Sequence, residues 1–116
     1  MKGQHHLLAD VQCRQDLDDL DNVLAFAEAV VAATGLTSQK TVFQVFPNGS
    51  SFGPGITVLH LLSESHLAIH TAPNRSYLNL DLFSCREFDP QAIWVLIGQH
   101  FGITRLDRWD LLRRHE

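Results

Sequence analysis

The alternation of apolar and polar residues predicts a chain built largely of β-strands. The clearest case is Tyr77–Cys85, where Leu78, Leu80 and Leu82 point to one side and the residues between them point to the other. The other predicted strands are short apolar-rich segments, at His5–Cys13, Thr41–Phe46, Ile56–Leu62, His66–Thr71 and Ile103–Leu112. The segment Pro47–Gly55 has the composition of a loop, either a flexible lid over a substrate or a plain hairpin connection.

Two segments have apolar residues at helical spacing. The first follows the aspartate-rich stretch Asp16–Asp21, and Gly35 is a natural stop for it. These aspartates could bind a metal ion, but acidic residues also favour the start of a helix, and we prefer that interpretation. The second helix begins at Asp89, an N-cap followed by Pro90 at the first helical position, and ends at Gly102.

This order of elements, β-α-β-β-β-β-α-β, predicts an α+β fold. Mostly antiparallel strands with two helices on one face make a two-layer sandwich. At 116 residues the chain has room for one domain, residues 1–116, and it contains no internal repeat or long linker. The sheet then has a second face. The polar residues Asn79, Asp81 and Cys85 on that face suggest contact with a partner subunit or a substrate rather than with water.

Composition excludes several classes of protein. Hydrophobic residues make up 45% and charged residues 19%, as in folded globular proteins, and the net charge of −4 offers no basic surface for nucleic acid. No apolar run approaches the roughly 18 residues that cross a membrane, and the N-terminus lacks the apolar core of a signal peptide. We therefore expect a cytoplasmic protein whose two cysteines are free thiols. The seven histidines form no metal-binding cluster, so we predict no metal site, and we expect His5 and His6 to be exposed.

Chemically active residue types concentrate in Ser63–Thr71, which contains serines, a carboxylate and two imidazoles. On an unbroken strand, Ser65 and His70 are an odd number of residues apart and face opposite sides of the sheet. For His70 to reach Ser65, the chain must turn or bulge around Glu64. The polar sequence Ser-Glu-Ser-His between two apolar runs allows a turn, and a strained turn can expose a peptide bond to attack by its own side chain.

These residues could support self-cleavage of the chain. The Ser65 hydroxyl would attack the carbonyl of Glu64, so that an ester replaces the amide. A base would then remove the Ser65 α-proton, and elimination would leave dehydroalanine, which hydrolyses to a pyruvoyl group. An imidazole suits that base because it is largely neutral at working pH. The residues alone leave a plainer interpretation open, in which the stretch holds two strand histidines and turn serines.

The wider sequence resembles a known family. The stretch SESHLAIHTAP, followed by LDLFSC and by Asp-Pro at the start of a helix, is similar to the prokaryotic S-adenosylmethionine decarboxylase proenzyme family. The segment HHLLADVQC and the Asp-Asn-Val of Asp21–Val23 also resemble that family, so the resemblance runs from about His6 to the C-terminus. It implies the two-layer sandwich, a homodimer with active sites at the subunit interface, and decarboxylation of S-adenosylmethionine for spermidine biosynthesis.

The resemblance also implies how the chain is processed. Cleavage between Glu64 and Ser65 would give a β chain of residues 1–64 and an α chain of residues 65–116. The α chain would begin with a pyruvoyl group made from Ser65, which serves as the electron sink for decarboxylation. His70 matches the family's processing histidine. Thr57 stands where the family usually has a serine that assists processing, so the resemblance implies the same role for the threonine hydroxyl.

Substrate-facing residues match the family only in part. Cys85 matches the cysteine that delivers a proton to the substrate carbon in that family. The plainer alternative is that Cys85 only packs as a small hydrophobic residue in the core. Phe46 or Phe52 could match the aromatic residue that stacks on adenine. Ala72 and Asn74 stand where the family normally has tryptophan and glutamate. The pattern fits an S-adenosylmethionine decarboxylase or a relative that acts on ornithine or arginine. The other alternative is a binding or regulatory subunit whose chain is never cleaved.

Overall fold

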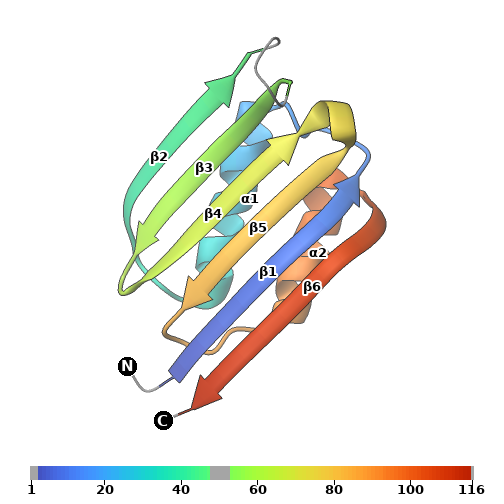
Figure 1. The fold of residues 1–116 in the computed structure, drawn as a ribbon. Coiled ribbons are helices and arrows are strands. Elements are labelled where there is room, and N and C mark those ends of the chain that lie inside the picture. Colours follow the sequence, from blue (N-terminus) through green and yellow to red (C-terminus); the bar gives the residue numbers. More distant parts are fainter. Residues whose placement is uncertain (1–2, 48–52, 116) are drawn as a thin grey trace.

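The computed structural model describes residues 3–47 and 53–115, which form a sheet with two helices on one of its faces (Figure 1). The elements in chain order are β1 (Gly3–Cys13), α1 (Leu20–Thr34), β2 (Ser38–Phe46), β3 (Gly55–Leu62), β4 (Ser65–Ala72), a short 3-10 helix (Pro73–Arg75), β5 (Tyr77–Ser84), α2 (Pro90–Phe101) and β6 (Ile103–His115). The strands lie in the order β2-β3-β4-β5-β1-β6, and every neighbouring pair is antiparallel. The predicted α+β two-layer sandwich is confirmed.

Two strands are longer than their apolar content indicates. β6 does not end at Leu112 but continues to His115, because its last residues pair with β1 as far as Gly3. The basic end of the chain is therefore part of the sheet rather than a tail. β2 begins at Ser38, which pairs with Leu62 across an irregularity in the register. Pairing partners, rather than local hydrophobicity, set these strand ends.

The helices begin and end at residues that satisfy their terminal backbone groups. The Asp19 carboxylate accepts a hydrogen bond from a backbone N–H in the first turn of α1, and Asp89 does the same for α2. Such an N-cap stabilises a helix by about 1 kcal/mol. Gly35 ends α1 in the left-handed conformation that glycine adopts without steric cost. The aspartate-rich stretch thus supplies the predicted helix start.

The hydrophobic core lies between the sheet and the helices. Alternate residues of the central strands point toward the helices, as period-two side-chain geometry requires. Its fully buried members include Leu7, Val11, Leu67, Ile69, Leu78, Leu80 and Leu82 from the sheet, and Phe26, Val30, Ile93, Ile97 and Phe101 from the helices. Leu78, Leu80 and Leu82 of β5 all point toward this core, so they share one side of the strand as the alternation predicts.

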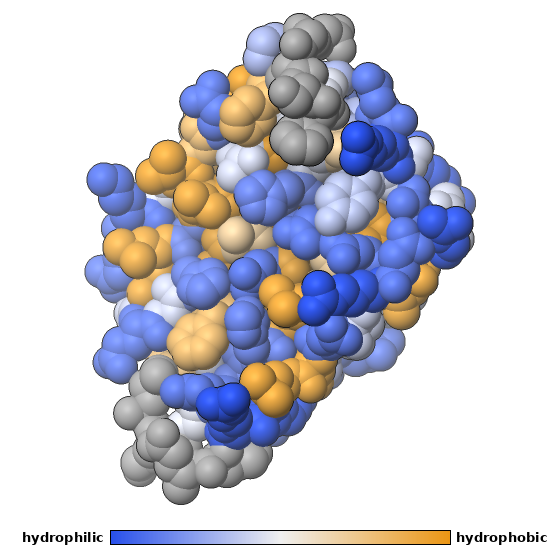
Figure 2. Space-filling model, viewed as in Figure 1, coloured by the Kyte–Doolittle hydropathy of each residue, from blue (hydrophilic) through white to orange (hydrophobic). Residues whose placement is uncertain are grey.

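The face of the sheet opposite the helices, which we call the open face, is not covered by either helix (Figure 1). Figure 2 views this face and shows apolar side chains interspersed with polar ones. Leu59 and Leu61 of β3 are about half exposed on it. Within residues 3–47 and 53–115, no helix is long and apolar enough to cross a membrane.

Candidate active site

The peptide bond between Glu64 and Ser65 lies at the end of the hairpin turn between β3 and β4. Leu62 pairs with Ser65, so Ser63 and Glu64 form the turn. Glu64 is exposed and has a φ of 56°, a left-handed conformation that is uncommon for a residue with a side chain. Sparsely populated backbone conformations cost about 1–3 kcal/mol. The turn therefore holds a strained residue next to the predicted cleavage site.

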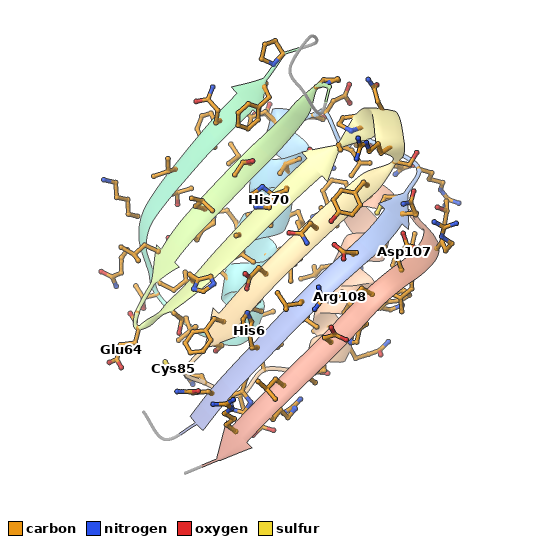
Figure 3. The ribbon with its side chains drawn as sticks, viewed as in Figure 1. His6, Glu64, His70, Cys85, Asp107 and Arg108 are labelled. Atoms are coloured by element: carbon orange, nitrogen blue, oxygen red, sulfur yellow. The ribbon has the colours of Figure 1, made fainter. Side chains whose placement is uncertain are left out.

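The Ser65 hydroxyl contacts the chain that follows β5. Ser65 is only 7% exposed, and its Oγ accepts a hydrogen bond of 2.9 Å from the backbone N–H of Cys85. The Sγ of Cys85 lies 3.6 Å from the carbonyl oxygen of Ser63, which puts the thiol beside the turn. Figure 3 shows Cys85 and Glu64 at the same end of the sheet. Two of the predicted catalytic residues, Ser65 and Cys85, are thus brought together.

Figure 3 shows His70 farther along β4, away from Glu64 and Cys85. His70 is exposed, whereas Ser65 is buried, so the two side chains lie on opposite faces of the strand. β4 runs without interruption from Ser65 to Ala72 and pairs with strands on both sides. A rise of about 3.3 Å per residue separates the Cα atoms of Ser65 and His70 by about 16 Å. The turn precedes Ser65 and no bulge follows it. Within one chain, the predicted contact between Ser65 and His70 is therefore absent.

His70 instead pairs with Thr57. The two residues are direct cross-strand neighbours, and Thr57 Oγ1 lies 2.9 Å from His70 Nδ1. Both line a pocket of about 830 Å³, and Phe46 at the end of β2 lines it as well. Phe52 lies outside the described residues. The predicted site residues therefore form two groups, the Ser65 turn and this pocket.

Polar groups with shifted pKa values also line the pocket. Hydrogen bonds from Arg105 and from Gln12 hold the pKa of Asp107 below its usual value, so this carboxylate is ionised at neutral pH. Burial and a hydrogen bond to Asp10 raise the pKa of Tyr77 to about 12. The phenol therefore stays protonated, and its O–H donates a hydrogen bond of 2.5 Å to Asp10 Oδ1. The pocket combines an aromatic side, an anion and an imidazole.

The second cysteine and several histidines have packing positions. Burial raises the pKa of Cys13 to about 11, which makes its thiol unreactive. Burial also lowers the pKa of His60, which is 2% exposed, and of His100, which packs against the Phe26 ring. The prediction that His5 and His6 are exposed is wrong. His5 is 4% exposed, and His6 is partly buried on the open face.

The sequence does not predict a third group of reactive side chains on the open face. His6, His66 and Asp81 place one nitrogen or oxygen atom each within 4.8 Å of one another. The three residues belong to β1, β4 and β5, which are consecutive in the sheet but distant in the chain. Only the strand register, and not any sequence spacing, brings them together.

Comparison with known proteins identifies the family of this chain and supports its fold. The family model for S-adenosylmethionine decarboxylase matches residues 5–114. The S-adenosylmethionine decarboxylase proenzyme of Thermomicrobium roseum is 33% identical over 111 residues, which cover 93% of this chain and 90% of that protein. The proenzyme of the same name from Pelotomaculum thermopropionicum is 39% identical over 113 residues, covering 93% of this chain and 84% of the relative.

A solved structure shares the fold. The crystal structure of adenosylmethionine decarboxylase from Aquifex aeolicus superimposes with a TM-score of 0.74 over 97% of this chain and 91% of that one, at 23% identity. The sequence matches and the family model together extend over both candidate groups of residues. The chain therefore belongs to the S-adenosylmethionine decarboxylase family, as its sequence resemblance predicts.

Proposed function

We propose that this chain is a proenzyme that cleaves itself between Glu64 and Ser65 and then decarboxylates S-adenosylmethionine. The product would be the decarboxylated S-adenosylmethionine that donates aminopropyl groups in spermidine biosynthesis. The observation that carries the proposal is the hydrogen bond from the Cys85 backbone to the Ser65 hydroxyl, beside the left-handed Glu64. A nucleophile, a strained residue and a thiol meet at one turn, in a chain whose relatives are named decarboxylase proenzymes.

Cleavage is consistent with the way Ser65 is held. The Cys85 N–H donates to the hydroxyl oxygen, so the hydroxyl proton remains available for transfer to a base. Attack on the Glu64 carbonyl replaces the amide with an ester, and cleavage then releases Glu64 from its left-handed conformation. The resulting chains, residues 1–64 and 65–116, would stay together because β1 pairs with β5 and β3 pairs with β4.

The surroundings of Ser65 also fit the pyruvoyl group that would replace it. The Cys85 N–H that donates to the hydroxyl is placed to donate to an oxygen in the same position. When formed, this group supplies an electron sink for loss of the substrate carboxylate as carbon dioxide. Cys85 is partly exposed beside the turn. Cysteine is among the side chains that act as general acids, so Cys85 can deliver the proton that the substrate carbon needs afterwards.

A second copy of the chain would complete this site. His70 and Thr57 lie about 16 Å along the sheet from Ser65, so in our proposal they serve the Ser65 of another chain. When two open faces meet around a two-fold axis across the strands, the His70 end of one β4 lies over the Ser65 end of the other. Such contact would also cover the half-exposed Leu59 and Leu61. We therefore propose a homodimer with one site at each end of the interface.

The pocket that holds His70 would then bind the substrate. Phe46 presents an aromatic ring on which adenine can stack. Ala72 also lines the pocket, where the family usually has a much larger tryptophan. The ionised Asp107 could pair with a second cationic group on a smaller substrate. These two observations support ornithine or arginine as the second candidate substrates.

A decarboxylation assay tests the proposal. Purified protein is incubated separately with S-adenosylmethionine, ornithine and arginine while the released carbon dioxide is counted. We expect turnover of S-adenosylmethionine, and a full-length Ser65→Ala variant should turn over none of the three. Turnover of ornithine or arginine alone would contradict the proposed substrate. A wild-type chain that stays whole and inactive would instead support a binding or regulatory subunit.

The proton-delivery role of Cys85 has its own test. Replacing Cys85 by alanine should spare at least part of the cleavage and lower turnover by about 10²–10⁴-fold, the usual contribution of a general acid. Cys13→Ala is the matched control, because that thiol is buried and unreactive. It should leave turnover near the wild-type rate, and normal turnover in Cys85→Ala would remove the assigned role.

We assign the enzyme to the cytoplasm. Both Cys13 and Cys85 are free thiols, which fits a reducing compartment. Fractionation of cells that make the protein should recover it with the soluble contents, and recovery with the membranes would contradict this assignment.

A further inference from the structure

The cluster formed by His6, His66 and Asp81 on the open face has a geometry that follows from strand register. Phe83 of β5 pairs with His66 on one side and with His6 on the other. Asp81 precedes Phe83 by two residues and points to the same face. Both imidazoles reach the same oxygen of this carboxylate, His6 Nε2 at 2.6 Å and His66 Nε2 at 3.4 Å from Asp81 Oδ1. None of the three residues lines the pocket that holds His70.

We infer that His6, His66 and Asp81 form a binding site for a divalent transition-metal ion of the Zn²⁺ type. Two imidazole nitrogens and one carboxylate oxygen are ligands that such ions bind well, whereas Mg²⁺ and Ca²⁺ favour sets made of oxygen. Bonds of about 2.0–2.2 Å to a common ion hold ligand atoms about 3 Å apart. The three atoms already lie within 4.8 Å of one another, so small side-chain rotations suffice.

The surroundings keep the two imidazoles in place and leave the cluster accessible. The Phe83 ring stacks on His66 at a centroid distance of 5.8 Å and meets His6 edge-on at 5.6 Å. This ring restricts how far either imidazole can turn away from Asp81. In a single chain the three side chains keep between 32% and 48% of their surface exposed, so an ion can enter from solvent before the proposed dimer covers the open face. With three protein ligands, at least one coordination position remains for water or another ligand.

The ion would also connect the two chains made by the proposed cleavage. His6 belongs to residues 1–64, whereas His66 and Asp81 belong to residues 65–116. His66 directly follows Ser65, so its coordination would anchor the start of the α chain. This consequence rests on the proposed function. Binding of the ion itself requires neither cleavage nor turnover.

Calorimetric titration of the metal-stripped, full-length protein with Zn²⁺ tests the inference. We expect one ion per chain, with equal affinity in the uncleaved Ser65→Ala protein. The substitutions His6→Gln, His66→Gln and Asp81→Asn keep polar side chains of similar size. Loss of a residue that only hydrogen-bonds to a metal ligand already lowers metal affinity by about 10–100-fold. Each of these substitutions removes a ligand itself, so it should weaken Zn²⁺ binding by more than that. Circular dichroism of each variant establishes that it is folded.

A histidine elsewhere on the open face provides the matched control. His70→Gln removes an exposed imidazole that has a threonine rather than a carboxylate as its partner, and it should leave Zn²⁺ affinity unchanged. Visible absorption of bound Co²⁺ should likewise appear in the wild type and in His70→Gln but not in Asp81→Asn. The inference is overturned if the wild type shows no saturable binding, or if Asp81→Asn binds Zn²⁺ as tightly as the wild type. Loss of binding in Ser65→Ala alone would also overturn it, whereas failure of cleavage would affect only the proposed function.

Discussion

The distance between Ser65 and His70 along β4 predicts that these residues act from different chains. The decisive perturbation combines two inactive full-length variants, Ser65→Ala and His70→Ala. The first has no hydroxyl to attack Glu64, and the second lacks an imidazole whose contribution as a base is about 10²–10⁴-fold. In a mixed dimer, the His70→Ala chain keeps its own Ser65 and receives the imidazole from the other chain. That chain alone should be cleaved.

The structure gives the size of the expected effect. Random pairing of equal amounts makes half of the dimers mixed, each with one complete site, so about a quarter of all chains should be cleaved. The alternative within one chain requires His70 to move about 13 Å closer to Ser65. β4 would then lose its pairing with both neighbours and expose the buried Leu67 and Ile69. Exposure of these two side chains costs about 3–6 kcal/mol.

The assay follows cleavage by intact-mass spectrometry. The two variants are unfolded, mixed, refolded and incubated, with one of them carrying a terminal tag so that its fragments have distinct masses. Each variant refolded alone is the negative control, and refolded wild type is the positive control. A mixture that stays uncleaved while refolded wild type cleaves would refute the two-chain site. Cleavage of the His70→Ala chain alone at the wild-type rate would refute any role for His70 in processing.

Three further predictions follow from burial and from the pocket. Iodoacetamide should label Cys85 in the native protein and leave Cys13 unlabelled, since burial raises the pKa of Cys13 to about 11, and equal labelling of the two peptides would contradict this. Burial lowers the pKa of His60 and of His100, so below about pH 6.5 the folded protein binds fewer protons than the unfolded chain. The free energy of unfolding should therefore have its full value above about pH 6.5. It should decrease as the pH falls toward the lowered pKa values of the two histidines. Urea unfolding at pH 8 and pH 5.5 measures this, and equal midpoints would count against it. Phe46→Ala should raise the KM for S-adenosylmethionine by about 2- to 10-fold, the value of an aromatic contact, with cleavage unchanged, and an unchanged KM would remove Phe46 from the substrate site.

Local chemistry explains those parts of the fold that the sequence predicts. Asp19 and Asp89 have side chains that cap helices, and Gly35 adopts the left-handed conformation at the end of α1. The alternation along Tyr77–Ser84 reflects one buried and one open face, which any strand of a two-layer fold must have. The turn at Glu64 follows from the polar interruption between two apolar runs. Each of these features depends on residues close together in the chain.

Strand register determines the parts that the sequence does not predict. The continuity of β4 separates Ser65 from His70, although they are only five residues apart. The same register gathers His6, His66 and Asp81 from three strands, at positions whose spacing along the chain matches no metal-binding motif. A shift of one residue in any pairing would move these side chains to the other face. Long-range pairing of this kind cannot be read from local patterns.

The most direct test of the central claim is the intact mass of the purified protein before and after reduction with borohydride in the presence of S-adenosylmethionine. We predict two fragments in place of the 13.1 kDa chain, one ending at Glu64 and the other beginning with a blocked residue derived from Ser65. Reduction should add the mass of the trapped substrate or its product to the second fragment only. A chain that keeps its full mass after prolonged incubation, or a second fragment that gains no mass, would contradict the claim that Ser65 becomes the catalytic group.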